Sequence, residues 1–221
     1  MSDHQIRMKK YAYIFYGCAI EADRLQEKED QRQQRITGDM IEGRRLLNGV
    51  PEKFREKTVK TYIPSKETML AWQAVSSLSR GQSHNVLLLG PVGVGKSHLA
   101  CAAINTLTEL AVECRYVYAP DLLDMLREKL TEPTLHDLVY NELYRIPFLA
   151  MDDIGVDRDT AWTVSVYMKL IDNRYRNEKP MLLTTNLSME ELEVAVGQRS
   201  MSRICESYEI VQMSGEDWRL R

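Results

Sequence analysis

The sequence predicts an α/β domain in which a parallel sheet is flanked by helices on both faces. A short apolar run, a glycine-rich loop and a helical pattern follow one another over residues 86–104. Beyond them, short apolar runs alternate with amphipathic stretches, which is the pattern of βαβ units. With 221 residues, 44% of them hydrophobic and 28% charged, the chain has room for one such domain and an appendage.

Residues 1–48 are expected to form a separate helical segment that binds a partner. Residues 21–35 are almost without apolar side chains, and a helix that is polar all round either bridges through solvent or is held by another protein. The aromatic cluster at residues 11–16 fits a small local core, with a protein-docking surface or a base-stacking platform as alternatives. Residues 1–60 carry 13 Lys+Arg against 10 Asp+Glu, a net charge of +3, and the remainder carries −6. This asymmetry permits a contact with nucleic acid or an acidic partner.

The elements of the main domain are expected to follow Gly49-Val50-Pro51, which marks a boundary. Residues 52–63 are interpreted as an extended, charged connector. Ser65 is expected to be the N-cap of a helix that runs to about Arg80 and is stopped by Gly81. Strands are expected at 86–89, 114–118, 148–151, 181–185 and 208–213, and further helices at 98–104, 121–130, 133–144 and 162–176.

The glycine-rich loop matches G-x-x-x-x-G-K-[ST] in full, between a strand and a helix, and predicts a nucleoside triphosphate site. Glycines let successive backbone N–H groups point at phosphate oxygens, and the positive end of the next helix dipole adds to that field. Lys96 is placed to reach the outer phosphates, and the Ser97 hydroxyl to bind Mg²⁺. The residues expected to bind the nucleotide are Gly90, Pro91, Val92, Gly93, Val94, Gly95, Lys96, Ser97 and His98.

Polar side chains follow the third and fourth predicted strands. Asp152 is expected to bind Mg²⁺ at the carboxyl edge of the sheet, and Asp153 to orient or deprotonate an attacking water. Asn186 is expected within reach of the γ-phosphate or that water, with a turn-forming asparagine as the alternative. Arg199 and Arg203 share a face if they lie on a helix. If the nucleotide sits at a subunit junction, one of them could reach into the site of a neighbouring subunit and stabilise transition-state charge, and plain surface arginines are the alternative.

Other sites are not indicated by the composition. The four cysteines and four histidines are scattered and lack the paired spacing of a zinc site, so reduced thiols in a cytoplasmic protein are expected. No apolar run is long enough to span a membrane, and the first residues do not resemble a secretory signal.

Residues 49–221 resemble the AAA+ ATPases, and among them the DnaC/DnaI-type replicative helicase loaders and the similar IstB transposition helpers. The motifs that carry the resemblance are Gly49-Val50-Pro51, Gly90–Ser97, Asp152-Asp153-Ile154-Gly155, Thr160-Ala161-Trp162, residues 172–177, Thr185-Asn186 and Ser202-Arg203-Ile204.

The resemblance implies an AAA+ domain with sheet order 5-1-4-3-2. It places Asp152 and Asp153 in the second acidic motif, Asn186 as the first sensor and Arg203 as a trans-acting arginine finger. It also places Arg219 in a sensor-like position. Many AAA+ proteins carry Glu where this chain has Asp153, which implies slow ATP hydrolysis. The sequence ends soon after the fifth strand, and no C-terminal helical lid is expected.

By the same resemblance, the function expected is ATP-dependent loading of a hexameric DnaB-type helicase onto single-stranded DNA. ATP or ADP with Mg²⁺ would be the cofactors, self-assembly would depend on ATP, and the helices at about 121–146 would line a DNA channel. The alternative is an IstB-like transposition helper that acts on duplex target DNA with a transposase. A small-molecule P-loop kinase and an adaptor without nucleotide binding fit the motifs less well.

Overall fold

The computed structural model describes residues 41, 43–81, 85–128, 133–156 and 161–215. The chain divides into two compact units, Met1–Gly43 and Arg44–Arg221, and every helix and strand labelled below belongs to the second. The predicted helical segment 1–48 lies mostly outside the described residues, although residues 41 and 43–47 are helical. Residues 216–221, which include Arg219, also lie outside the described residues. The prediction that no C-terminal helical lid is present falls on this part of the chain.

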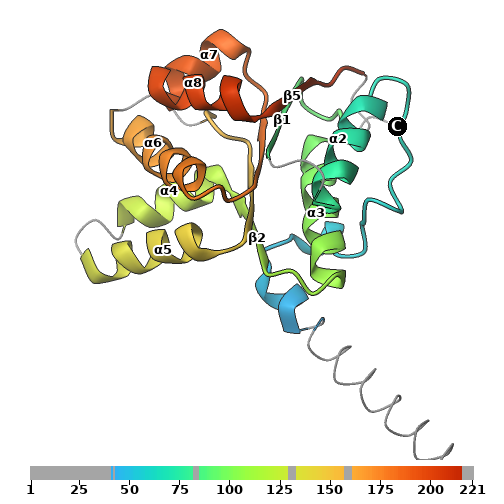
Figure 1. Cartoon of the computed structure of the whole chain (residues 1–221), viewed down its shortest axis with the longest axis horizontal. Coiled ribbons are helices and arrows are strands. Elements are labelled where there is room, and N and C mark those ends of the chain that lie inside the picture. Colours follow the sequence, from blue (N-terminus) through green and yellow to red (C-terminus); the bar gives the residue numbers. More distant parts are fainter. Residues whose placement is uncertain (1–40, 42, 82–84, 129–132, 157–160, 216–221) are drawn as a thin grey trace, which may run out of the picture. The chain divides into compact units, whose positions relative to one another are not determined.

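Five parallel strands form one sheet in the order β2-β3-β4-β1-β5. This confirms the predicted order 5-1-4-3-2 (Figure 1). Since all strands are parallel, their carboxyl ends meet at one edge of the sheet, where ligands bind in open α/β folds. The strands are β1 Asn85–Leu89, β2 Cys114–Tyr118, β3 Phe148–Asp152, β4 Met181–Thr185 and β5 Glu209–Gln212.

Helices cover both faces of this sheet, as Figure 1 shows. Side chains of β1 alternate between two apolar clusters: Val86 and Leu88 pack in one, and Leu87 and Leu89 in the other. The first cluster includes helices α2 (Met69–Ser79) and α3 (Lys96–Glu109). The second includes α4 (Ala119–Glu128), α5 (Pro133–Arg145), α6 (Ala161–Arg176), α7 (Met189–Val196) and α8 (Gln198–Ser207). Within the described ranges, no helix has the length and apolar character needed to cross a bilayer.

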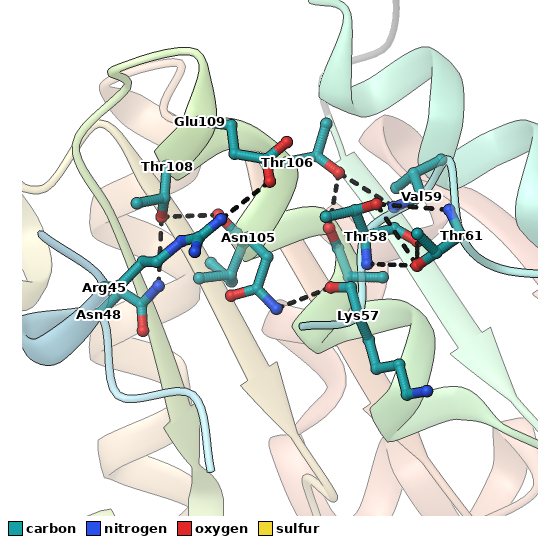
Figure 2. Close-up of polar contacts among 12 residues, drawn as sticks. Arg45, Asn48, Lys57, Thr58, Val59, Thr61, Asn105, Thr106, Thr108 and Glu109 are labelled. Carbon is teal, nitrogen blue, oxygen red and sulfur yellow. Dashed lines mark hydrogen bonds and ion pairs between the residues drawn. The ribbon is translucent and has the colours of Figure 1, made fainter. Parts of the chain in front are cut away.

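The connector before α2 is folded rather than extended, so that prediction was wrong. It contains a short 3₁₀ helix, η1 (Glu52–Phe54), and turns. Figure 2 shows how it lies along α3. Asn105 Nδ2 donates to the carbonyls of Phe54 and Lys57, each at 2.7 Å, and Thr106 Oγ1 accepts from the Val59 amide at 3.0 Å. These contacts fix the connector along the second half of α3.

The start of α2 also differs from the prediction. The helix begins at Met69, with Thr68 in the N-cap position, and Ser65 is therefore not its N-cap. Residues 65–68 form a turn in which the Thr68 hydroxyl accepts from the Ser65 amide at 2.9 Å. At the other end, Gly81 has φ +72 and its amide donates to the Leu78 carbonyl at 3.0 Å. A left-handed residue of this kind is typical of a helix end, as predicted.

A buried arginine on α6 ties the end of α5 to the sheet. Arg174 is 0% exposed, and it donates to backbone carbonyls rather than to a carboxylate. Nη1 donates to Leu143 and Ile146 at 2.8 and 3.0 Å, and Nη2 to Pro147 and Pro180 at 3.2 and 2.8 Å. Burial lowers the pKa of Arg174 to about 10, so the guanidinium stays charged at neutral pH and satisfies carbonyls that α5 leaves unpaired.

Candidate nucleotide-binding site

The loop between β1 and α3 has the geometry of a phosphate-binding loop. Gly95 has φ +102 and stands in the N-cap position of α3, a backbone conformation that favours glycine. At Gly90 a Cβ would lie 2.3 Å from the Met213 carbonyl oxygen, so a larger residue would displace the end of β5. The loop therefore leads directly from the sheet edge to the positive end of a 14-residue helix, where an anion is favoured.

Lys96 lies inside this loop and points across the sheet edge. The residue is 5% exposed. Its Nζ donates to the carbonyl oxygens of Gly90 and Pro91 at 2.7 and 2.8 Å, and to Asn186 Oδ1 at 2.5 Å. The ammonium is thus positioned between the loop and the end of β4.

Asp153 is joined to the same group of residues. Its backbone has φ +57, and its amide donates to Thr184 Oγ1 at 2.9 Å. Asn186 Nδ2 donates to Asp153 Oδ1 at 3.3 Å. Three residues named from the sequence, Lys96, Asn186 and Asp153, therefore form one hydrogen-bonded chain across the sheet edge.

Asp152 is held by hydroxyl groups from the two neighbouring strands. Its side chain is buried, and Oδ2 accepts from the Tyr116 hydroxyl at 2.6 Å while Oδ1 accepts from the Thr184 hydroxyl at 2.5 Å. Burial, followed by the charge of Asp152, raises the pKa of Tyr116 well above its ordinary value, so the phenol remains a donor. The contacts of these two hydroxyls with Asp152 could not be predicted from the sequence, because Tyr116 and Thr184 lie on separate strands.

A cleft of about 350 Å³ opens at this edge of the sheet. Asp153 lines it, whereas the adjacent Asp152 is buried and is not among the described residues that line it. Ser97 and Asp153 present oxygen atoms of the kind that Mg²⁺ prefers, so the residues present fit that ion. The assignment of Ser97 and Asp152 as its ligands stays a prediction. The predicted residues along the cleft are Val92, Gly93, Gly95, Lys96, Ser97, His98, Asp153 and Asn186.

Two aromatic residues at the cleft, Phe54 and Tyr118, were not predicted. Phe54 comes from the connector and stacks on His98 with ring centroids 5.7 Å apart, while the Tyr62 and His98 rings meet edge to face with centroids 5.1 Å apart. Tyr62, Val94 and His98 line a second cleft of about 320 Å³, which shares Gly95 and His98 with the first. Phe54 and Tyr62 stand out as aromatic residues in the charged connector, and this was the sequence feature that could have indicated their place at the clefts.

The imidazole of His98 lines both clefts and can donate or accept a hydrogen bond in its neutral form. Within the described residues, its buried Nε2 has no hydrogen-bond partner. Burial, and secondarily the charge of Lys57, lowers the pKa of His98 below its ordinary value of 6.5. A buried polar atom without a partner is costly, and here it lies where two clefts meet.

The two arginines on α8 lie elsewhere in the protomer. Arg199 and Arg203 share one helix face, as predicted, and both form ion pairs with Asp172 on α6. Neither is among the described residues that line the 350 Å³ cleft. The structure therefore brings together the loop, the acidic pair and Asn186, but it does not bring Arg203 to the cleft of its own protomer.

Comparisons with known proteins identify a family and several relatives. A family model described as IstB-like ATP binding protein matches residues 54–221. The replicative helicase loader DnaC of Escherichia coli K12 is 26% identical over 125 residues, which cover 56% of this chain and 51% of DnaC. The replicative helicase loader DnaI of Bacillus subtilis 168 is 26% identical over 185 residues, which cover 81% of this chain and 56% of DnaI.

Solved structures share the fold. The replication initiator DnaA, solved with AMPPCP and single-stranded DNA, superposes with a TM-score of 0.67 at 22% identity, covering 76% of this chain and 51% of that chain. The sheet order and flanking helices are those of the P-loop AAA+ fold. The chain spans about half the length of the curated relatives that it matches.

Proposed function

Because the chain belongs to the family of IstB-like ATP-binding proteins, we propose that it is an Mg²⁺-dependent AAA+ ATPase that loads a hexameric replicative helicase onto single-stranded DNA. The observation that carries the ATPase part is the hydrogen-bonded chain from Lys96 through Asn186 to Asp153. It connects the phosphate loop to the acidic pair along one wall of the cleft.

In this proposal each residue of the cleft has a separate task. The loop amides and Lys96 bind the phosphates, and Ser97 and Asp152 hold Mg²⁺, which when bound neutralises phosphate charge. Asp153 orients or deprotonates the attacking water, and Asn186 keeps that carboxylate at a fixed position relative to Lys96. The short side chain of Asp153 favours slow turnover, so ATP acts mainly as a switch for assembly.

The second cleft is proposed to hold the nucleoside. It adjoins the phosphate loop through Gly95 and His98, and Tyr62 offers an aromatic edge next to His98. The partnerless Nε2 of His98 would gain a hydrogen bond to the ribose or the base.

The loader part of the proposal is supported by DnaC and DnaI, both of which are replicative helicase loaders. Residues 1–48 would engage the hexameric helicase, and α4 and α5, which connect β2 to β3, would face single-stranded DNA. Arg203 would act in an ATP-dependent oligomer by reaching the nucleotide of the neighbouring protomer. This activity belongs to the cytoplasm, where the replicative helicase works.

The second candidate is a transposition helper that acts on duplex DNA with a transposase. The match of residues 54–221 to the IstB-like family model favours it. The two candidates share the nucleotide site and differ in the DNA that the assembled protein prefers and in the partner.

Fluorescence anisotropy tests the choice between them. Labelled single-stranded DNA and a duplex of the same sequence are titrated with protein in ATP, in ADP and without nucleotide. A loader binds the single strand more tightly, and only when ATP is present. Lys96→Ala should remove the ATP effect, whereas Lys66→Ala, in the exposed turn before α2, should keep it. Preference for the duplex would move the assignment to the transposition helper.

A further inference from the structure

Four charged side chains gather on α6 and α8, away from the nucleotide cleft. Asp172 Oδ2 accepts from Arg176 Nη2 at 3.1 Å, and Asp172 Oδ1 accepts from Arg199 Nη2 at 3.3 Å. Arg203 Nη1 also pairs with Asp172 Oδ1. Three guanidinium groups share one carboxylate, so the cluster keeps two positive charges in excess.

Burial separates the three arginines into two kinds. The side chains of Arg176 and Arg199 are 64% and 63% exposed, whereas those of Arg203 and Asp172 are 14% and 13% exposed. Exposed ion pairs contribute little because solvent screens them. The Arg203–Asp172 pair is therefore the one that solvent screens least.

Tyr175 holds the same guanidinium from a second direction. The Arg203 guanidinium carbon lies 5.0 Å from the centre of the Tyr175 ring, and the Tyr175 hydroxyl donates to Glu206 Oε1 at 2.9 Å. Arg203 is therefore fixed by a carboxylate and by a ring that is itself anchored on α8. An arginine loses much side-chain entropy when it is ordered. In this protein, the contacts with Asp172 and Tyr175 order the Arg203 side chain within its own protomer.

We propose that Asp172 is a positioning residue that fixes Arg203 of one protomer for contact with the nucleotide phosphates of the next. The inference rests on the proposed function, in which Arg203 acts in trans. The ion pair engages Nη1, and a guanidinium has five N–H donors in a planar fork, so donors remain for a second anion. Because the cluster has two excess positive charges, Asp172 orients Arg203 without neutralising the surface that meets that anion.

A protomer-mixing experiment separates this inference from the proposed function. Lys96→Ala protein has a defective nucleotide site and an intact Asp172–Arg203 pair, and Arg203→Ala protein has the reverse. Each alone is expected to hydrolyse ATP slowly, and the mixture is expected to regain a fraction of the wild-type rate. If the mixture regains nothing, or if Arg203→Ala alone matches wild type, the trans role of Arg203 is wrong.

Asp172→Asn is then added to one protein at a time. In the Lys96→Ala protein, which supplies Arg203, it is expected to lower the regained rate by about 10²-fold, the cost of misplacing a catalytic group. In the Arg203→Ala protein it should change nothing, which a general structural defect would not allow. Glu193→Gln, which neutralises an exposed carboxylate on α7, is the control in either protein. An unchanged rate with Asp172→Asn in the Arg203 donor, or an equal loss in both proteins, overturns the positioning role while leaving the trans role intact.

Discussion

Lys96 Nζ donates to Asn186 Oδ1 at 2.5 Å, so the cation of the phosphate loop and the amide at the end of β4 share one hydrogen bond across the sheet edge. Asn186 also donates to Asp153 at 3.3 Å. A change at any of these three residues alters the contacts of the others, and their effects on ATP binding and turnover are expected to be non-additive.

Lys96→Ala is expected to abolish measurable ATP binding, with affinity lowered by roughly 10²-fold or more, because the phosphates lose charge-assisted hydrogen bonds from the buried ammonium. Titration with a fluorescent ATP analogue measures this. Lys66→Ala should bind as wild type does. ATP affinity equal to wild type in the Lys96 variant would contradict the assignment of the site.

Asp153→Asn is expected to bind ATP but to hydrolyse it about 10²–10⁴-fold more slowly, the usual contribution of a general base. Phosphate release under saturating ATP measures the rate, and Glu193→Gln, at an exposed carboxylate on α7, serves as the control. An unchanged rate would mean that another group activates the water.

Tyr116→Phe is expected to lower the free energy of unfolding by about 1.5–3 kcal/mol, because the buried Asp152 carboxylate loses a hydroxyl donor. Urea denaturation measures the change. Tyr175→Phe removes a hydroxyl that donates to Glu206 at the surface and should leave the stability nearly unchanged. Equal effects of the two substitutions would show that the hydrogen bond from Tyr116 to Asp152 contributes no more to the free energy of unfolding than the exposed one from Tyr175 to Glu206.

Arg174→Met is expected to cost about 3 kcal/mol or more in the free energy of unfolding, because four backbone carbonyls lose their donor in a buried site. Its neighbour Arg176, whose side chain is 64% exposed, provides the control: Arg176→Met should have little effect. Guanidinium denaturation of both variants makes the comparison, and a wild-type midpoint for Arg174→Met would refute the role given to this residue.

His98 is expected to make the protein less stable as the pH falls below about 6.5. Its pKa in the folded protein lies below the ordinary value of 6.5 because of burial and Lys57, so the unfolded chain takes up a proton first. Stability therefore rises with pH across the interval between the folded and unfolded pKa values, and is fully present above the unfolded one. Thermal unfolding of wild type and His98→Gln over this range checks the sign, since the variant should show a smaller loss in acid. A larger loss in the variant would contradict it.

The parts of the site that lie on one continuous stretch could be predicted from the sequence. The loop at residues 90–97 has a fixed spacing that follows from its chemistry, Asp152 ends one strand, and Asn186 directly follows another. The sheet order followed from the family resemblance and was confirmed by strand pairing. Helix α7 was missed, although Ser188 and Glu191 form a capping box that the spacing S-x-x-E signals.

Contacts between distant segments could not be predicted from local patterns. Tyr116 and Thr184 meet Asp152 from separate strands, and the connector follows α3 because Asn105 and Thr106 bind its backbone. The charged composition of residues 52–63 favoured an extended segment. It does not reveal that backbone groups of this segment form hydrogen bonds with side chains of α3. The pairing of Arg203 with Asp172 likewise depends on how α6 packs against α8.

Light scattering after size exclusion, with the hexameric replicative helicase of the source organism, tests the loader proposal most directly. The protein and the helicase are expected to elute as one large complex, and the complex is expected to be lost when residues 1–48 are removed. Lys96→Ala should form it without the response to ATP that the wild-type protein shows. Separate elution of the two proteins, with ATP and without it, would contradict the loader function.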